Sequence, residues 1–150
     1  MKNTVYILLA LVTLFLQRVS GEENSSYYFT HINGDNGLSS SNVKAIIQDS
    51  YGLWFGTKNG LNRFDGTSIL RMNCEDHQLK KGNNNISALY EDSNRNLWVG
   101  TDRGVYLYHP ASDVFTHINQ TSKEGKAMDN WVSAIVGDTE GNIWVIIPDQ

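Results

Sequence analysis

The chain has 150 residues, of which 12 are Lys or Arg and 16 are Asp or Glu, so its formal net charge is −4. A mildly acidic chain is not expected to have nucleic acid or an anionic membrane as its main partner. Its single cysteine, Cys74, excludes a disulfide within the chain, so the stability of the fold has to come from packing.

The first 21 residues are predicted to be a secretory signal peptide. Lys2 supplies a positive start, residues 5–16 form an apolar run, and Val19-Ser20-Gly21 suits a signal peptidase. The run is about a dozen residues long, whereas a membrane span needs roughly 20. We therefore expect cleavage after Gly21, export to the periplasm and no membrane span in the mature segment. An uncleaved anchor is the alternative.

Residues 22–42 are predicted to contain one isolated strand followed by a loop. The stretch from Tyr27 to Asn33 is rich in aromatic and β-branched residues, which favours a strand. Its last five residues, 29–33, are identical to residues 115–119. In a closed propeller, such a strand pairs with strands from the far end of the chain and joins the two ends of the ring.

One sequence pattern occurs three times along the rest of the chain. Each copy has an apolar segment, an aspartate with a turn, and a second segment that contains a tryptophan. The copies begin at Val43, Ile86 and Val132, and their tryptophans are Trp54, Trp98 and Trp144. The intervals between the tryptophans are 44 and 46 residues. A repeat of this length, built from short strand-like pieces, is typical of a β-propeller.

Each copy is predicted to supply strands of a four-stranded antiparallel blade. In the first strand, residues 43–48, we expect Val43, Ala45 and Ile47 to share one face. Ile46 interrupts the alternation, which indicates a strand buried on both sides. The later strands of the first copy are expected at 53–57, 61–65 and 68–72, with a tight turn before the third strand.

The sequence thus predicts an all-β fold, a β-propeller segment of about two and a half blades. The predicted parts are a signal peptide (1–21), an N-terminal strand and loop (22–42), blade 1 (43–73), a loop (74–85), blade 2 (86–119), a loop (120–131) and a partial blade 3 (132–150). An incomplete propeller leaves sheet faces and edges exposed. We therefore expect association with further propeller blades or with another copy of the chain.

Twelve repeated positions are predicted to have structural roles. The aspartates are expected to accept N–H bonds in turns, and the tryptophans to pack between neighbouring sheets, with sugar stacking as the alternative for the tryptophans. The Gly-Thr pairs are expected to allow close backbone approach, and the later glycines to form hairpin turns. The positions are Asp49, Trp54, Gly56, Thr57, Gly60, Asp92, Trp98, Gly100, Thr101, Gly104, Asp138 and Trp144.

The third copy departs from the pattern, since Ile146-Ile147-Pro148 replaces Gly-Thr and the proline weakens the strand. No catalytic residue, metal ligand or cofactor is predicted, because the repeated aspartates lie on separate blades without converging ligands. Ligand-binding residues are not assigned, since a propeller site forms from loops of several blades.

These repeats resemble the two-component regulator propeller repeat. The resemblance rests on Val43 to Asp49, Leu53 to Thr57 and Gly60 to Asp65, and on the second copy from Ile86 to Tyr108. The leader and the stretch from Gly37 to Val43 are similar to the start of the periplasmic sensor in hybrid two-component systems of gut Bacteroidetes.

In that family the propellers sense oligosaccharides, and a membrane helix, a histidine kinase and a response regulator follow in the same polypeptide. The resemblance implies that this chain is the N-terminal part of such a sensor. It also implies a glycan-derived ligand, and no enzymatic activity in this segment itself.

Two other function classes stay open. A propeller-fold enzyme, such as a lyase or a glycan hydrolase, would need acid, base or metal groups that converge in a central funnel. A non-catalytic propeller that binds other proteins is the third possibility. A resemblance in fold does not separate these classes.

Overall fold

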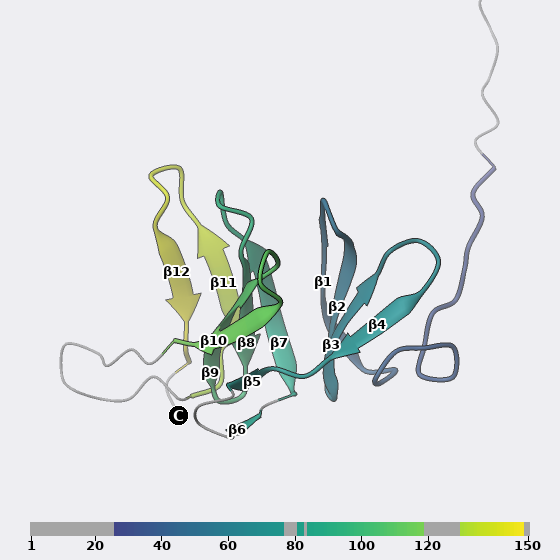
Figure 1. The fold of residues 1–150 in the computed structure, drawn as a ribbon, viewed down its shortest axis with the longest axis horizontal. Helices are drawn as coiled ribbons and strands as arrows, with labels where there is room; N and C mark the ends of the chain where they lie inside the picture. Colours follow the sequence, from purple (N-terminus) through teal and green to yellow (C-terminus); the bar gives the residue numbers. More distant parts are fainter. Residues whose placement is uncertain (1–25, 77–80, 83, 119–129, 149–150) are drawn as a thin grey trace, which may run out of the picture. The chain divides into compact units, whose positions relative to one another are not determined.

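The computed structural model describes residues 26–76, 81–82, 84–118 and 130–148, and its regular elements are all β-strands (Figure 1). The chain divides into two units, residues 1–31 and 32–150. In the first unit, the described residues 26–31 are exposed and lie outside any strand. The predicted signal peptide lies outside the described residues.

The second unit contains two four-stranded antiparallel sheets and part of a third. Blade 1 consists of β1 (Val43–Asp49), β2 (Gly52–Thr57), β3 (Gly60–Phe64) and β4 (Ile69–Met72). Blade 2 consists of β7 (Ile86–Glu91), β8 (Leu97–Thr101), β9 (Gly104–His109) and β10 (Val114–His117). Blade 3 is represented by β11 (Ala134–Gly137) and β12 (Ile143–Ile146). The predicted class of fold, an incomplete propeller of antiparallel blades, is confirmed.

The segment between blades 1 and 2, predicted as a loop, carries a short two-stranded ladder. Its strands are β5 (Glu75–Asp76) and β6 (Lys81–Gly82). Strand β12 ends two residues before Pro148, in agreement with the expectation that this proline weakens the strand.

The strand predicted from Tyr27 to Asn33 is not present in the structure, where residues 26–33 have no strand pairing. A strand needs a hydrogen-bonded neighbour, because its backbone N–H and C=O groups are otherwise unpaired. The predicted partner strands belong to the blade that would close the propeller, so the pairing of residues 27–33 with them stays a prediction.

Two details predicted for β1 are wrong. Ile46 is exposed, so β1 is buried on one side only, whereas β7 is covered on both sides, with Leu89 in the cluster with blade 1 and Tyr90 in the cluster with blade 3. Val43 and Ala45 were predicted to share one face of the strand, but a β-bulge separates them. The strand β7 has the same bulge between Ile86 and Ala88. A bulge adds one residue to a strand and thereby turns the preceding side chains to the other face.

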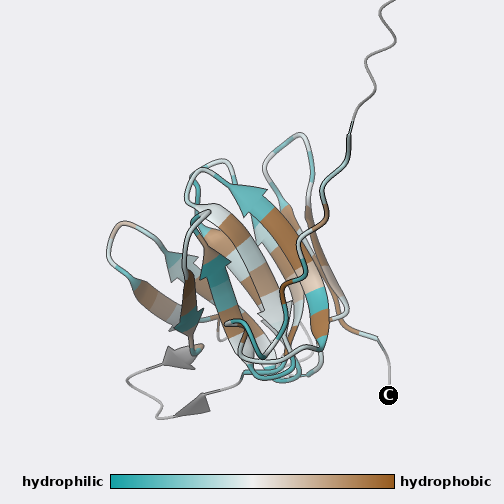
Figure 2. Cartoon of the chain, turned by 90° about the vertical axis from the view of Figure 1, so that its right-hand side faces the viewer, coloured by the Kyte–Doolittle hydropathy of each residue, from teal (hydrophilic) through white to brown (hydrophobic). Residues whose placement is uncertain are grey.

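The blades approach one another through their first strands, since β7 contacts both β1 and β11 (Figure 1). Hydrophobic and polar bands alternate along the strands (Figure 2), as expected when each blade packs against its neighbours. Two hydrophobic clusters fill the spaces between blades. One contains Trp54 and Leu61 of blade 1 with Leu97 and Tyr108 of blade 2, and the other joins blades 2 and 3.

A buried threonine closes the turn between the second and third strands of each complete blade. The hydroxyl of Thr101 donates to the carbonyl oxygen of Gly104 at 2.9 Å and accepts the N–H of Arg103 at 3.1 Å. Thr57 makes the same two bonds, to Gly60 and Asn59. Gly60 and Gly104 have φ of 143° and 100°, a region that favours glycine. The threonines therefore hold the turn as well as extending the strand.

We expect Thr101→Val to destabilise the fold by about 1–3 kcal/mol, because it keeps the shape of the side chain but leaves buried turn groups without their partner. Urea unfolding measures this change. Thr101→Ser is the matched control, since it keeps the hydroxyl, and it should be clearly less destabilising. Equal losses for the valine and serine variants would contradict the role assigned to the hydroxyl.

Candidate functional site

Each repeat tryptophan donates its indole N–H to the aspartate of its own blade. The Nε1–Oδ2 distances are 2.7 Å for Trp54 and Asp49, 2.9 Å for Trp98 and Asp92, and 2.9 Å for Trp144 and Asp138. The other carboxylate oxygen, Oδ1, accepts backbone N–H groups of the following turn, as the sequence predicted; the donors are Tyr51, Asn94 with Asn96, and Glu140 with Asn142. The aspartate therefore fixes both the turn and the orientation of the indole ring, and the second role was not predicted.

These hydrogen bonds stabilise the ionised carboxylate in the second and third blades. The indole of Trp144, followed by the amide of Asn142, lowers the pKa of Asp138 to about 2. Desolvation acts to raise the pKa of Asp92, but hydrogen bonds from Trp98, Asn96 and Asn94 outweigh it and lower the pKa. Ionised aspartate is thus part of the folded blade.

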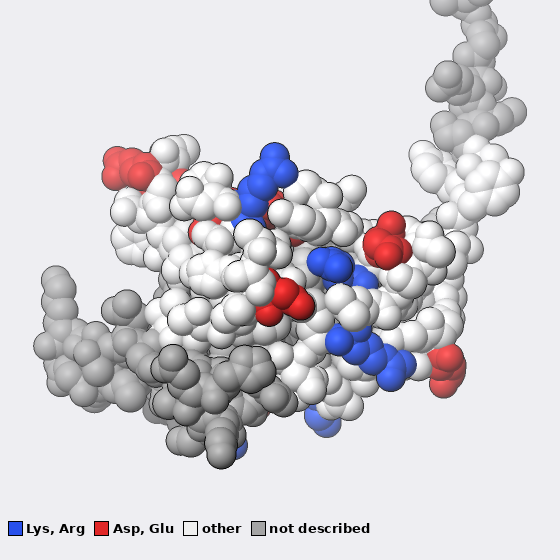
Figure 3. Space-filling model, viewed as in Figure 1, with Lys and Arg blue, Asp and Glu red and all other residues white. Residues whose placement is uncertain are grey.

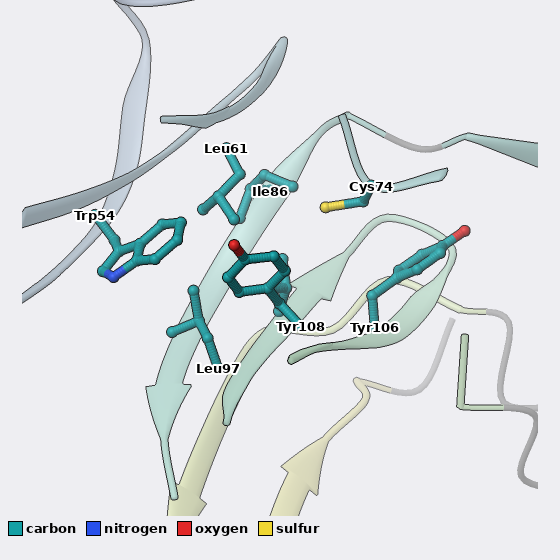
Figure 4. Close-up of a cluster of buried hydrophobic side chains, with 8 residues drawn as sticks. Trp54, Leu61, Cys74, Ile86, Leu97, Tyr106 and Tyr108 are labelled. Atoms are coloured by element: carbon teal, nitrogen blue, oxygen red, sulfur yellow. The ribbon is translucent and has the colours of Figure 1, made fainter. Parts of the chain in front are cut away.

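The tryptophan of each blade points toward the next blade. Trp54 is fully buried and makes an edge-on contact with Tyr108 of blade 2, with ring centroids 5.5 Å apart (Figure 4). Trp98 is half-buried and packs against the cluster between blades 2 and 3. Trp144, on the last described blade, is 59% exposed. The indole ring is buried or half-buried where a described blade follows and mostly exposed where none does, as expected for a packing role.

A glycine two residues after each of the first two tryptophans receives a branched side chain from the next blade. A Cβ atom at Gly56 would lie 2.6 Å from Cγ2 of Ile86, and one at Gly100 would lie 2.7 Å from Cγ1 of Val132. We call Ile86 and Val132 knobs. The bulge in β7 makes this contact possible, because it turns Ile86 toward blade 1 while Ala88 faces blade 3. The close approach predicted for the Gly-Thr pairs is thus an approach of neighbouring blades.

Cys74 is buried in the cluster between blades 1 and 2, where desolvation raises the pKa of its thiol. A buried, protonated thiol is a poor nucleophile. Among the described residues, no group of three or more His, Cys, Asp or Glu side chains is placed to hold a metal ion.

Polar side chains join blades 1 and 2 at the end where their first strands begin. The ammonium of Lys44 donates to Oδ1 of Asn85 at 2.8 Å, and the amide of Asn85 donates to Oδ2 of Asp102 at 3.1 Å. Lys44 is the bulged residue of β1, Asn85 precedes β7, and Asp102 lies in the turn from β8 to β9. These three side chains combine donors and acceptors in an exposed arrangement.

The backbone on both sides of an exposed tryptophan is held against the turn that carries Asp102. Trp131, the fourth tryptophan of the chain, is 47% exposed and directly precedes the knob Val132. Backbone bonds hold its flanks against the turn that carries Asp102: Gly104 N–H donates to the carbonyl of Asn130, and Val132 N–H to that of Thr101. We name Lys44, Asn85, Asp102 and Trp131 the inner rim.

The inner rim was not found from the sequence. The three residues that precede the sequence copies at Val43, Ile86 and Val132 are Asn42, Asn85 and Trp131, so a fourth tryptophan outside the repeat position was the available signal. The bulge that presents Lys44 has no such signal, because a register shift is a property of the paired strands. On the face shown in Figure 3, the Lys and Arg side chains of the described residues lie among Asp and Glu side chains and do not form a basic track.

Comparison with known proteins identifies the repeats. Residues 37–59 and 80–103 match the family described as two component regulator propeller. These two stretches are therefore similar to two-component regulator propeller repeats. A stretch of 57 residues is 47% identical to histidine kinase P4 of Formosa agariphila, over 36% of this chain and 4% of that protein.

Solved structures show a similar fold. The extracellular domain of a putative hybrid two-component system from B. thetaiotaomicron matches 80% of this chain and 18% of its own length, with 28% identity and a TM-score of 0.66. A second such domain from the same organism matches 78% of this chain and 15% of its own length, with 23% identity and a TM-score of 0.54, which shows the fold alone. The chain therefore spans less than a fifth of these relatives. No helix in the described part of the chain has the length and apolar character needed to cross a membrane.

The Asp138–Trp144 bond predicts a defined acid sensitivity. The folded-state pKa of about 2 lies below the ordinary value of 3.8, so the ionised group stabilises the fold above about pH 4. This contribution is lost as the pH falls from about 4 toward 2. Urea unfolding between pH 2 and 6 should show that Trp144→Phe, which removes the indole N–H, weakens this part of the pH dependence. An unchanged pH dependence in Trp144→Phe would contradict the assignment.

Proposed function

We propose that this chain is part of an extracytoplasmic sensor of a hybrid two-component system, and that the sensor recognises an oligosaccharide. The observation that carries the proposal is the stacking of repeat blades through glycine and knob, in a chain 28% identical to the extracellular domain of such a system. The predicted signal peptide and periplasmic location accord with the extracellular location named for that relative. Binding of the ligand, rather than catalysis, is the activity proposed for this segment.

The inner rim has the chemistry that a sugar ligand requires. Sugar hydroxyls need both donors and acceptors, and Lys44, Asn85 and Asp102 provide an ammonium, an amide and a carboxylate. The apolar face of a sugar ring packs on an aromatic side chain, and Trp131 presents an exposed indole beside the same turn. Loops that a rigid sheet scaffold holds in place are common positions for binding residues.

We expect an oligosaccharide to stabilise the sensor and Trp131→Ala to weaken this binding by roughly tenfold. The complete extracellular portion is screened against neutral and acidic oligosaccharides by thermal shift, and affinities are then measured by calorimetry. Tyr51→Ala is the matched control, because Tyr51 is an exposed aromatic residue in the turn at the other end of β1.

A screen in which no oligosaccharide stabilises the protein would contradict the proposed ligand class. Binding that Trp131→Ala and Tyr51→Ala weaken equally would contradict the proposed position of the site. Lys44→Met should also weaken binding, whereas Arg95→Met should not, because Arg95 donates to Ser50 at the other end of the strands.

A further inference from the structure

Blade 3 exposes an apolar face on the side away from blade 2. Val136, Trp144 and Ile146 are 48%, 59% and 51% exposed, respectively. Ile143 and Val145 alternate with Trp144 and Ile146 along β12, and they pack instead in the cluster shared with blade 2. The three exposed side chains therefore lie on one outer face, which we call the blade 3 face.

The blade 3 face repeats two interfaces that are already covered within the chain. Trp144 stands at the position of Trp54 and Trp98, and each of these packs against the following blade. Val136 stands at the position of Ile47 and Tyr90, which also pack in the interblade clusters. This continuity indicates that the natural occupant is another blade, placed as blade 2 is placed on blade 1.

One position differs, and it restricts the occupant. Gly56 and Gly100 leave room for the knobs Ile86 and Val132, and a Cβ added at either glycine would lie less than 3 Å from the knob. On the blade 3 face the same position holds Ile146, whose side chain fills this space. A branched knob would collide with it, since well-packed interfaces do not absorb extra methyl groups without strain.

Another contact in the chain already pairs a large side chain on one blade with a small residue on the next blade. Blade 2 carries Tyr90 where blade 1 carries Ile47, and blade 3 carries Gly137 where blade 2 carries Glu91. The ring and hydroxyl of Tyr90 occupy the space that a Cβ at Gly137 would need. A large residue on one blade is thus matched by a small residue on the next.

We propose that the blade 3 face is covered by a further propeller blade whose knob is glycine, alanine or serine. The occupant is not blade 1 of a second copy. The knob position of blade 1 holds the branched Val43, and its outer face is partly covered by the chain's own residues: Leu38 is buried, and Ser39 N–H donates to the buried Asn62 at 2.8 Å. The inference rests on the stacking of blades and is independent of the ligand.

The test extends the whole chain with a copy of residues 102–118, which completes blade 3, and then a copy of residues 73–118, which adds a fourth blade. Four versions combine Ile146 or Ile146→Gly with Ile86 or Ile86→Ala in the added blade. On native Ile146, the alanine knob should melt roughly 2–10 °C higher than the isoleucine knob. With Ile146→Gly, the order should reverse.

The same order of melting temperatures in both backgrounds would overturn the proposal, as would four fusions no more stable than the unextended chain. An unextended chain that forms a dimer in sedimentation, with Trp144 protected from acrylamide quenching, would also overturn it in favour of a second copy.

Discussion

The close approach of neighbouring blades at Gly56 and Gly100 is the constraint on which the rest of the structure depends. Each glycine admits a branched knob from the next blade, so that the first strands meet. Interiors are packed as densely as organic crystals, and one added methyl group is felt. The β-bulge in the first strand serves this contact, because without it the knob and Ala88 would point to the same side.

The aspartate and tryptophan of each blade also contribute to the packing of neighbouring blades, because their hydrogen bond fixes the orientation of the indole ring. The carboxylate binds the turn with one oxygen and the indole with the other, so in blades 1 and 2 the ring is held against the next blade. A buried ring with a satisfied N–H contributes its apolar area without an unpaired polar group. The inner rim then follows as a consequence of stacking, because Asn85 and Lys44 belong to different blades and meet where these blades come together.

Much of the fold was predictable from the sequence, since tryptophans and glycines at a fixed interval determine the blades. The partners of these residues were harder to predict. Ile86 and Ala88 look equivalent in the sequence, and only strand pairing shows the bulge that separates them. The sequence indicated a turn role for Asp92 and a packing role for Trp98, but not the hydrogen bond that Trp98 donates to Asp92. The inner rim depends on loops of unequal length, and the strand predicted at residues 27–33 depends on a partner blade.

The most direct test of this account is a double-mutant cycle across the first blade interface, with Gly56→Ala and Ile86→Ala measured by urea unfolding. Alone, Gly56→Ala should cost about 1–3 kcal/mol through overpacking, and Ile86→Ala about 2–5 kcal/mol through lost burial. Together they should cost at least about 1 kcal/mol less than the sum, because the alanine at position 86 makes room for the added methyl group. Additive losses would show that the two residues do not share one packed contact, and would contradict the central role given to it.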